Sequence, residues 1–93
     1  MARLVARIRI LPADAEINTD EVAKAIGGAI PSGMVLKAHA KEPIAFGLNA
    51  LVGDFLLEDA EGQMDKLEES IKAVHGVGEI EVVNISRESV KMK

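Results

Sequence analysis

Residues 3–11 read Arg-Leu-Val-Ala-Arg-Ile-Arg-Ile-Leu, and this alternation decides how the rest of the chain is interpreted. One side of it is apolar and the other is mostly charged: Leu4, Ala6, Ile8 and Ile10 against Arg3, Val5, Arg7 and Arg9. A period of two is that of a β-strand, and an apolar side opposite a charged side indicates a sheet with one buried and one exposed face. Pro12 is expected to end the strand because it has no N–H to donate.

A helix is predicted to follow, starting at Asn18. The Asn18 side chain can accept from backbone N–H groups of the first turn, and Glu21 three residues later completes a capping box. The apolar positions recur every fourth residue: Val22, Ile26 and Ile30. They predict one narrow buried stripe. Gly27 and Gly28 weaken the second half of this helix by about 1 kcal/mol each relative to alanine, and residues 31–33 are expected to end it.

Two further strands are predicted on either side of a loop bounded by proline and glycine. Residues 34–40 are short and weakly patterned, as is typical of an edge strand. Lys37, His39 and Lys41 are expected on one side of this strand, and Leu36 and Ala38 on the other. Residues 48–57 form the third strand, in which Gly53 predicts a bulge. This leaves open which face of the third strand is buried.

The second half of the chain repeats the pattern of the first. Residues 58–62 are a polar turn, and apolar residues then recur at helical spacing: Met64, Leu67, Ile71 and Val74. His75 and Gly76 predict the end of this second helix. Residues 79–85 are the last strand, and residues 86–93 are expected to be a charged C-terminal tail.

The order strand, helix, strand, strand, helix, strand predicts a ferredoxin-like βαββαβ fold of the α+β class. Right-handed crossovers place both helices on one face of a four-stranded antiparallel sheet, with the first and third strands central. We expect residues 1–93 to form a single domain, because the chain is too short for two.

Composition excludes several classes of protein. There is no cysteine, and His39 and His75 stand far apart, so a metal site, a cofactor and a cysteine nucleophile are not expected. No apolar run approaches the ~20 residues of a membrane helix, and no leader precedes the first strand, so a cytoplasmic protein is expected. The net charge of −4 disfavours binding to nucleic acid. No set of nucleophile, base and orienting group is present, which indicates a binding protein rather than an enzyme with catalytic residues.

Phe46 is the first residue to consider as a functional residue. It is one of two aromatic residues in the chain, and it lies on the loop between Pro43 and Gly47. A proline restricts the backbone and a glycine allows a sharp turn, so the loop can hold a side chain away from the domain. Because phenylalanine is usually buried, packing of Phe46 against the end of the core is the alternative.

Several stretches together resemble the archaeal elongation factor 1-beta family. They are residues 43–48 (Pro-Ile-Ala-Phe-Gly-Leu), Leu51, residues 58–62 (Glu-Asp-Ala-Glu-Gly), residues 65–71 (Asp-Lys-Leu-Glu-Glu-Ser-Ile) and residues 77–82 (Val-Gly-Glu-Ile-Glu-Val). The resemblance covers essentially the whole chain. It implies a guanine nucleotide exchange factor that promotes GDP release and GTP loading on elongation factor 1-alpha, without a covalent step, a small-molecule substrate or direct contact with nucleic acid or membrane.

The resemblance also implies which residues contact the partner. Phe46 matches the phenylalanine at the family's contact, framed by Ile44 and Gly47. A lysine near the chain end of eukaryotic relatives reaches toward the magnesium and phosphates, and its counterpart here is Arg87, Lys91 or Lys93. The alternative function is a regulatory domain of the same fold that dimerises through its open sheet and senses a small molecule.

Overall fold

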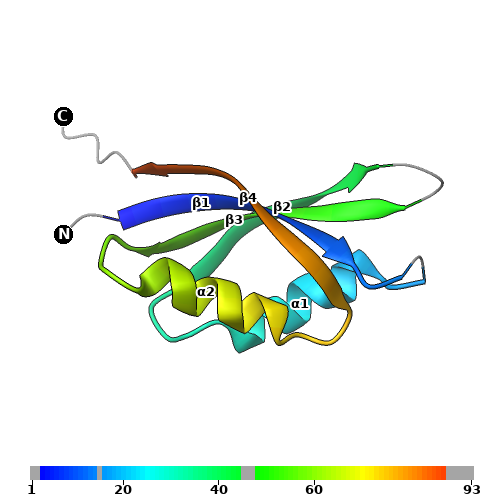
Figure 1. Ribbon diagram of the computed structural model, residues 1–93, viewed down its shortest axis with the longest axis horizontal. Coiled ribbons are helices and arrows are strands. Elements are labelled where there is room, and N and C mark those ends of the chain that lie inside the picture. Colours follow the sequence, from blue (N-terminus) through cyan, green and yellow to red (C-terminus); the bar gives the residue numbers. More distant parts are fainter. Residues whose placement is uncertain (1–2, 15, 45–47, 88–93) are drawn as a thin grey trace.

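Six secondary-structure elements make up the protein. In a computed structural model that describes residues 3–14, 16–44 and 48–87, they follow the predicted order. They are β1 (Arg3–Pro12), α1 (Thr19–Ala29), β2 (Val35–Pro43), β3 (Asn49–Glu58), α2 (Gln63–Lys72) and β4 (Val77–Arg87). The strands form one antiparallel sheet in the order β2-β3-β1-β4, and both helices cover the same face (Figure 1). The predicted ferredoxin-like α+β fold is therefore confirmed.

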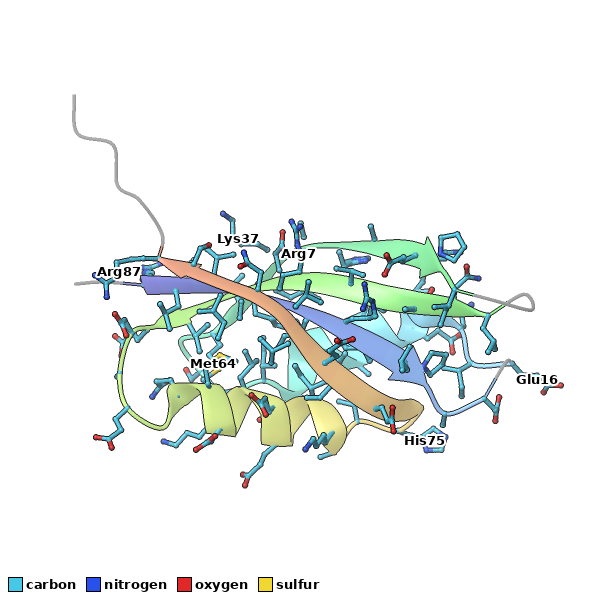
Figure 2. The ribbon with its side chains drawn as sticks, turned by 45° about the horizontal axis from the view of Figure 1, so that its top comes forward. Arg7, Glu16, Lys37, Met64, His75 and Arg87 are labelled. Atoms are coloured by element: carbon cyan, nitrogen blue, oxygen red, sulfur yellow. The ribbon has the colours of Figure 1, made fainter. Side chains whose placement is uncertain are left out.

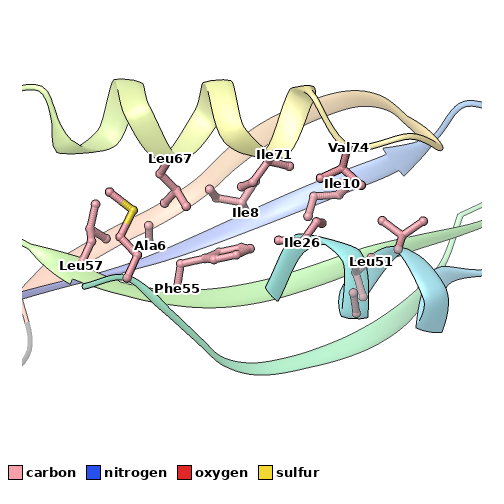
Figure 3. Packing of buried hydrophobic residues seen from close by; sticks show 13 residues of the cluster. Ala6, Ile8, Ile10, Ile26, Leu51, Phe55, Leu57, Leu67, Ile71 and Val74 are labelled. Carbon is pink, nitrogen blue, oxygen red and sulfur yellow. The ribbon is translucent and has the colours of Figure 1, made fainter. Parts of the chain in front are cut away.

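The core lies between the helices and one face of the central strands (Figure 3). Its largest fully buried side chains come from both central strands and both helices: Ile8, Ile10, Ile26, Phe55, Leu57, Leu67 and Ile71. Ala6 lies opposite Phe55 and Ile10 lies opposite Leu51 in the β1–β3 register. Since directly opposed residues share a face of the sheet, the alternation of β1 determines which side of β3 is buried.

Gly53 makes room within this core instead of forming a bulge. The β1–β3 register runs through it without a shift, because Ile8 pairs with Gly53. A Cβ on Gly53 would lie 3.0 Å from Leu36 Cδ1 and 3.0 Å from Phe55 Cε1. Real Cβ atoms rarely approach other atoms so closely, so a side chain here would displace the Phe55 ring. The bulge predicted near Gly53 is wrong.

β2 has an irregularity at Lys37, in addition to the two register shifts between β1 and β4 after Arg7 and after Leu11. The β2–β3 register shifts between Leu36, which pairs with Phe55, and Ala38, which pairs with Asp54. Lys37 is the extra residue, and it places Leu36 and Ala38 on opposite faces of the sheet. The prediction that Leu36 and Ala38 share a side is therefore wrong. Beyond the bulge β2 continues to Pro43, three residues further than predicted.

The first helix begins as predicted. The Asn18 side chain accepts hydrogen bonds from the backbone N of Asp20 at 2.8 Å and of Glu21 at 3.3 Å. Among the described residues, the Glu21 side chain makes no return bond, so half of the capping box is present. The helix extends over Gly27 and Gly28 to Ala29, because the buried Ile26 anchors the turn that contains both glycines.

The last strand is longer than predicted at both ends. β4 starts at Val77 and continues to Arg87, with Ser86 paired to Val5 and Arg87 paired to Leu4. Ser86 and Arg87 thus belong to the sheet and not to the tail, while residues 88–93 lie outside the described residues. The side-chain pattern could not predict this extension, because the added residues are held by backbone pairing with β1.

Candidate functional site

The predicted contact loop leaves the sheet at the end of β2. Ile44 is 45 % exposed although its side chain is large and apolar. Its backbone N donates to Leu48 O at 2.9 Å, which closes the base of the loop. Phe46 and Gly47 lie outside the described residues. Of the predicted contact residues in this loop, the structure describes Ile44, which faces solvent.

A shallow hollow lies beside the base of this loop. Its volume is about 200 Å³, and its lining includes Leu48 and Asn49 after the loop, Lys41 on β2 and Thr19 at the start of α1. The N-terminal turn of α1 and the loop between β2 and β3 therefore meet at one end of the molecule.

Arg87 lies at the opposite end. Its Nη2 donates to Asp59 Oδ2 at 3.0 Å, and the side chains are 71 % and 34 % exposed respectively. Asp59 follows β3 directly and precedes α2. The ion pair ties the end of β4 to the turn between β3 and α2, so Arg87 already has a carboxylate partner. Lys91 and Lys93, the other two predicted cations, lie outside the described residues.

The structure does not bring Ile44 and Arg87 together. The start of β1 and the end of β4 lie at one end of the sheet, and the end of β2 and the start of β3 lie at the other (Figure 1). β3 joins the two ends with 10 residues, which corresponds to about 33 Å at ~3.3 Å per residue. The predicted contact residues therefore form two separate surfaces rather than one site.

The open face of the sheet carries ion pairs that the sequence did not reveal. Arg7 holds Asp54 through two bonds, Nε to Oδ1 at 2.9 Å and Nη2 to Oδ2 at 3.2 Å. Arg9 donates through Nε to Glu42 Oε1 and through Nη1 to Glu81 Oε1, both at 2.9 Å. The acids come from three other strands, so spacing along the sequence gives no sign of them. Arg7 and Arg9 are thus paired with acidic residues of the same molecule.

The pair between Arg7 and Asp54 shifts the pKa values of both residues. The hydrogen bond from Arg7 is the main reason that the pKa of Asp54 lies below its ordinary value of 3.8, and nearby Lys37 lowers it further. The same bond raises the pKa of Arg7. Figure 2 shows Arg7 and Lys37 on the same side of the sheet, away from the helices. The Arg7 guanidinium and the Asp54 carboxylate therefore both stay charged at neutral pH.

Within residues 3–14, 16–44 and 48–87, no group of three or more metal-ligating side chains comes together. Across the same residues, no helix combines the length and apolar character needed to cross a bilayer.

Comparison with known proteins identifies the family. Residues 5–87 match the EF-1 guanine nucleotide exchange domain. The chain belongs to this family. Elongation factor 1-beta of Desulfurococcus amylolyticus is 43 % identical over 88 residues, which are 94 % of this chain and 98 % of that protein. The protein of the same name from Methanothermobacter thermautotrophicus is 38 % identical over 87 residues, again 94 % and 98 % of the two chains.

Membership in the EF-1 guanine nucleotide exchange family decides between the two functions that the sequence suggested. The protein is a guanine nucleotide exchange factor of translation elongation, and it performs no covalent catalysis. The predicted relationship to archaeal elongation factor 1-beta is confirmed. The comparison thus supports the exchange function and not the alternative of a small-molecule-sensing regulatory domain. The matched region ends at Arg87, so it includes the loop after β2 and the pair between Arg87 and Asp59.

Proposed function

We propose that this protein acts in the cytoplasm on elongation factor 1-alpha, promoting GDP release and GTP loading through contacts at both ends of its sheet. The observation that carries the proposal is the exposed Ile44 at the base of the loop that holds Phe46. An apolar residue of this size, 45 % exposed next to an aromatic residue, supports a contact with a partner.

At the loop end, Phe46 is the anchor and Ile44 and Gly47 are its frame. Buried aromatic anchors dominate the energy of many protein interfaces. The backbone bond from Ile44 to Leu48 fixes the base of the loop before the partner arrives. A fixed base lowers the ordering cost of binding, because fewer backbone angles have to be immobilised.

At the other end, a cation of the chain terminus acts on the nucleotide side of the partner. Arg87 is already bound to Asp59. Its role is therefore to fix the end of β4, after which the C-terminal residues begin. Lys91 and Lys93 then remain to approach the phosphates. A positive charge placed there disfavours magnesium and thereby weakens GDP binding.

The mechanism follows from linkage between two ligands on one partner. A factor that binds the nucleotide-free partner more tightly than the GDP-bound one must itself be weakened by GDP in the same ratio. The loop anchor and the terminal cation are the differential contacts that this requires. Because their surfaces lie about 33 Å apart, judged from the length of β3, the partner must offer two separate contact regions.

The test is release of fluorescent GDP from a purified archaeal elongation factor 1-alpha. We expect the protein to accelerate release, and Phe46→Ala and Ile44→Ala to reduce the acceleration while remaining folded. Val83→Ala is the matched control, because Val83 is an apolar residue of similar exposure, 44 % against 45 %, in the middle of β4. No acceleration by the unaltered protein would refute the exchange function on this partner. Equal losses in all three variants would refute the loop as the contact.

A further inference from the structure

A groove runs along the helix layer, on the side away from the sheet. It consists of two neighbouring hollows of about 550 Å³ and about 390 Å³. Both are lined by Ala25 of α1 and by His75, which follows α2. Buried residues of the core, Val22 and Val74, border it from below. None of these residues belongs to the contacts proposed above, so the groove has no role in the exchange mechanism as described.

Several of the side chains that line the groove are short. Ala25 and Ala29 lie one helical turn apart on α1, and across the hollow are Ser70 of α2 and Ala73, which follows that helix. The three alanines are exposed to solvent. Small side chains at positions i and i+4 allow the backbone of another helix to approach closely, because nothing extends between the two main chains.

Gly28 lines neither hollow, and it is an exposed residue of α1. It lies three residues after Ala25 on the same side of α1. A Cβ at Gly28 would meet no heavy atom within 4 Å. Glycine inside a helix costs about 1 kcal/mol relative to alanine, and packing within this chain does not offset that cost at Gly28. A close approach from outside the molecule is what a glycine here permits.

The charges of the groove are of one sign. Its ionised lining residues are Glu69 near one end and Glu16 and Glu21 at the other. The lysines of the two helices, Lys24, Lys66 and Lys72, line neither hollow. Glu16 and His75 lie at the same end of the molecule (Figure 2). An acidic, low-walled groove repels phosphates and favours a cationic occupant.

We propose that this groove docks a basic amphipathic helix of a protein partner. Its small apolar face lies over Ala25, Ala29 and Ala73, and its lysines or arginines meet the three glutamates. This is recognition of a helix in a groove, with the charges setting orientation. α1 has 11 residues, so the groove accommodates about three turns of a helix.

The experiment uses a synthetic helical peptide of about 15 residues, with alanine and leucine on one face and lysine on both flanks. A second peptide carries glutamate in place of every lysine. Each is titrated into the ¹⁵N-labelled protein. We expect the lysine peptide to shift the amide signals of Ala25, Ala29 and Ala73 and the glutamate peptide to leave them unchanged.

Two variants locate the site. The double substitution Glu21→Lys with Glu69→Lys is expected to weaken the lysine peptide about tenfold, and Ala73→Met to weaken it by filling the groove. Thermal unfolding checks that both variants are folded, and a variant that unfolds is replaced by Ala29→Met. Equal binding of the two peptides, shifts confined to the sheet, or unchanged affinity of the folded variants would overturn the proposal. So would self-association of the protein that Ala73→Met abolishes, because the occupant would then be a second copy.

Discussion

Alanine at Gly28 should stabilise the protein, whereas alanine at Gly78 should destabilise it. Gly28 lies within α1, and a Cβ there would have no neighbour within 4 Å. At Gly78 the added Cβ would lie 2.9 Å from Pro12 O and 3.1 Å from Ala13 Cα. Both of these atoms belong to backbone that is held by the bond from Ala13 N to Gly76 O at 2.8 Å. The same chemical change thus meets open space at one site and a fixed main chain at the other.

The magnitudes follow from these surroundings. At Gly28 only the conformational freedom of the unfolded chain changes, so the free energy of unfolding should rise by about 0.5–1 kcal/mol. For a domain of this size, that is an increase in Tm of about 2–8 °C. Gly27 has equally open surroundings and should behave alike. At Gly78 the strain of overpacking should lower the free energy of unfolding by about 1–3 kcal/mol.

Urea unfolding of the four proteins, followed by circular dichroism, measures these differences. Equal m values would show that the same amount of surface is exposed in each case. A loss of stability in Gly28→Ala would refute the conclusion that this glycine has no role in the fold, and with it one support for the groove. A gain in Gly78→Ala would show that the connection between β1 and β4 is looser than its hydrogen bond implies.

Three further outcomes can be checked, two by unfolding and the third by unfolding together with GDP release. Gly53→Ala should lower the free energy of unfolding by about 1–3 kcal/mol, because the new Cβ would meet Leu36 and Phe55 at 3.0 Å; an unchanged urea midpoint would contradict this. The Asp54 pKa is depressed in the folded state, so its contribution to stability is present above the unfolded pKa and is lost as pH falls through the folded pKa. Asp54→Asn should therefore flatten the acid limb of a stability profile against pH, and a steeper limb would oppose the assignment. Arg87→Ala should leave Tm almost unchanged, since its pair with Asp59 is exposed, yet slow GDP release; exchange at the original rate would remove Arg87 from the mechanism.

Much of the fold could be predicted because its elements differ in period. The alternation of β1 and the fourfold spacing of Val22 and Ile26 each correspond to one kind of element. The bulge at Lys37 could not be predicted, since the short side chains of Ala38 and Ala40 show no preference for either face. The end of β4 was missed for a related reason: its last pairs depend on the backbone of β1.

The sequence could predict which residues contact the partner, but it could not predict how these residues are arranged in space. The resemblance indicated Ile44 and Arg87, and nothing in their spacing showed that they lie at opposite ends of the sheet. The partners of Arg7 and Arg9 were also invisible, because Asp54, Glu42 and Glu81 reach them only once the strands are in order. Sequence distance carries no information about such contacts between strands.

Arg9 links the two edge strands that lead to the proposed contacts. Its guanidinium reaches across β3 to Glu42, the residue before Pro43, and also holds Glu81 on β4. Three spacings of about 4.8 Å separate β2 from β4, and the side chains of Glu42, Arg9 and Glu81 together bridge this width. Exposed pairs contribute little to global stability, but they oppose local opening of an edge. Two contacts act on one partner only if the distance between them is fixed. Arg9→Met should therefore slow nucleotide exchange more than it lowers Tm, and equal effects on both would show that the sheet edges need no such link.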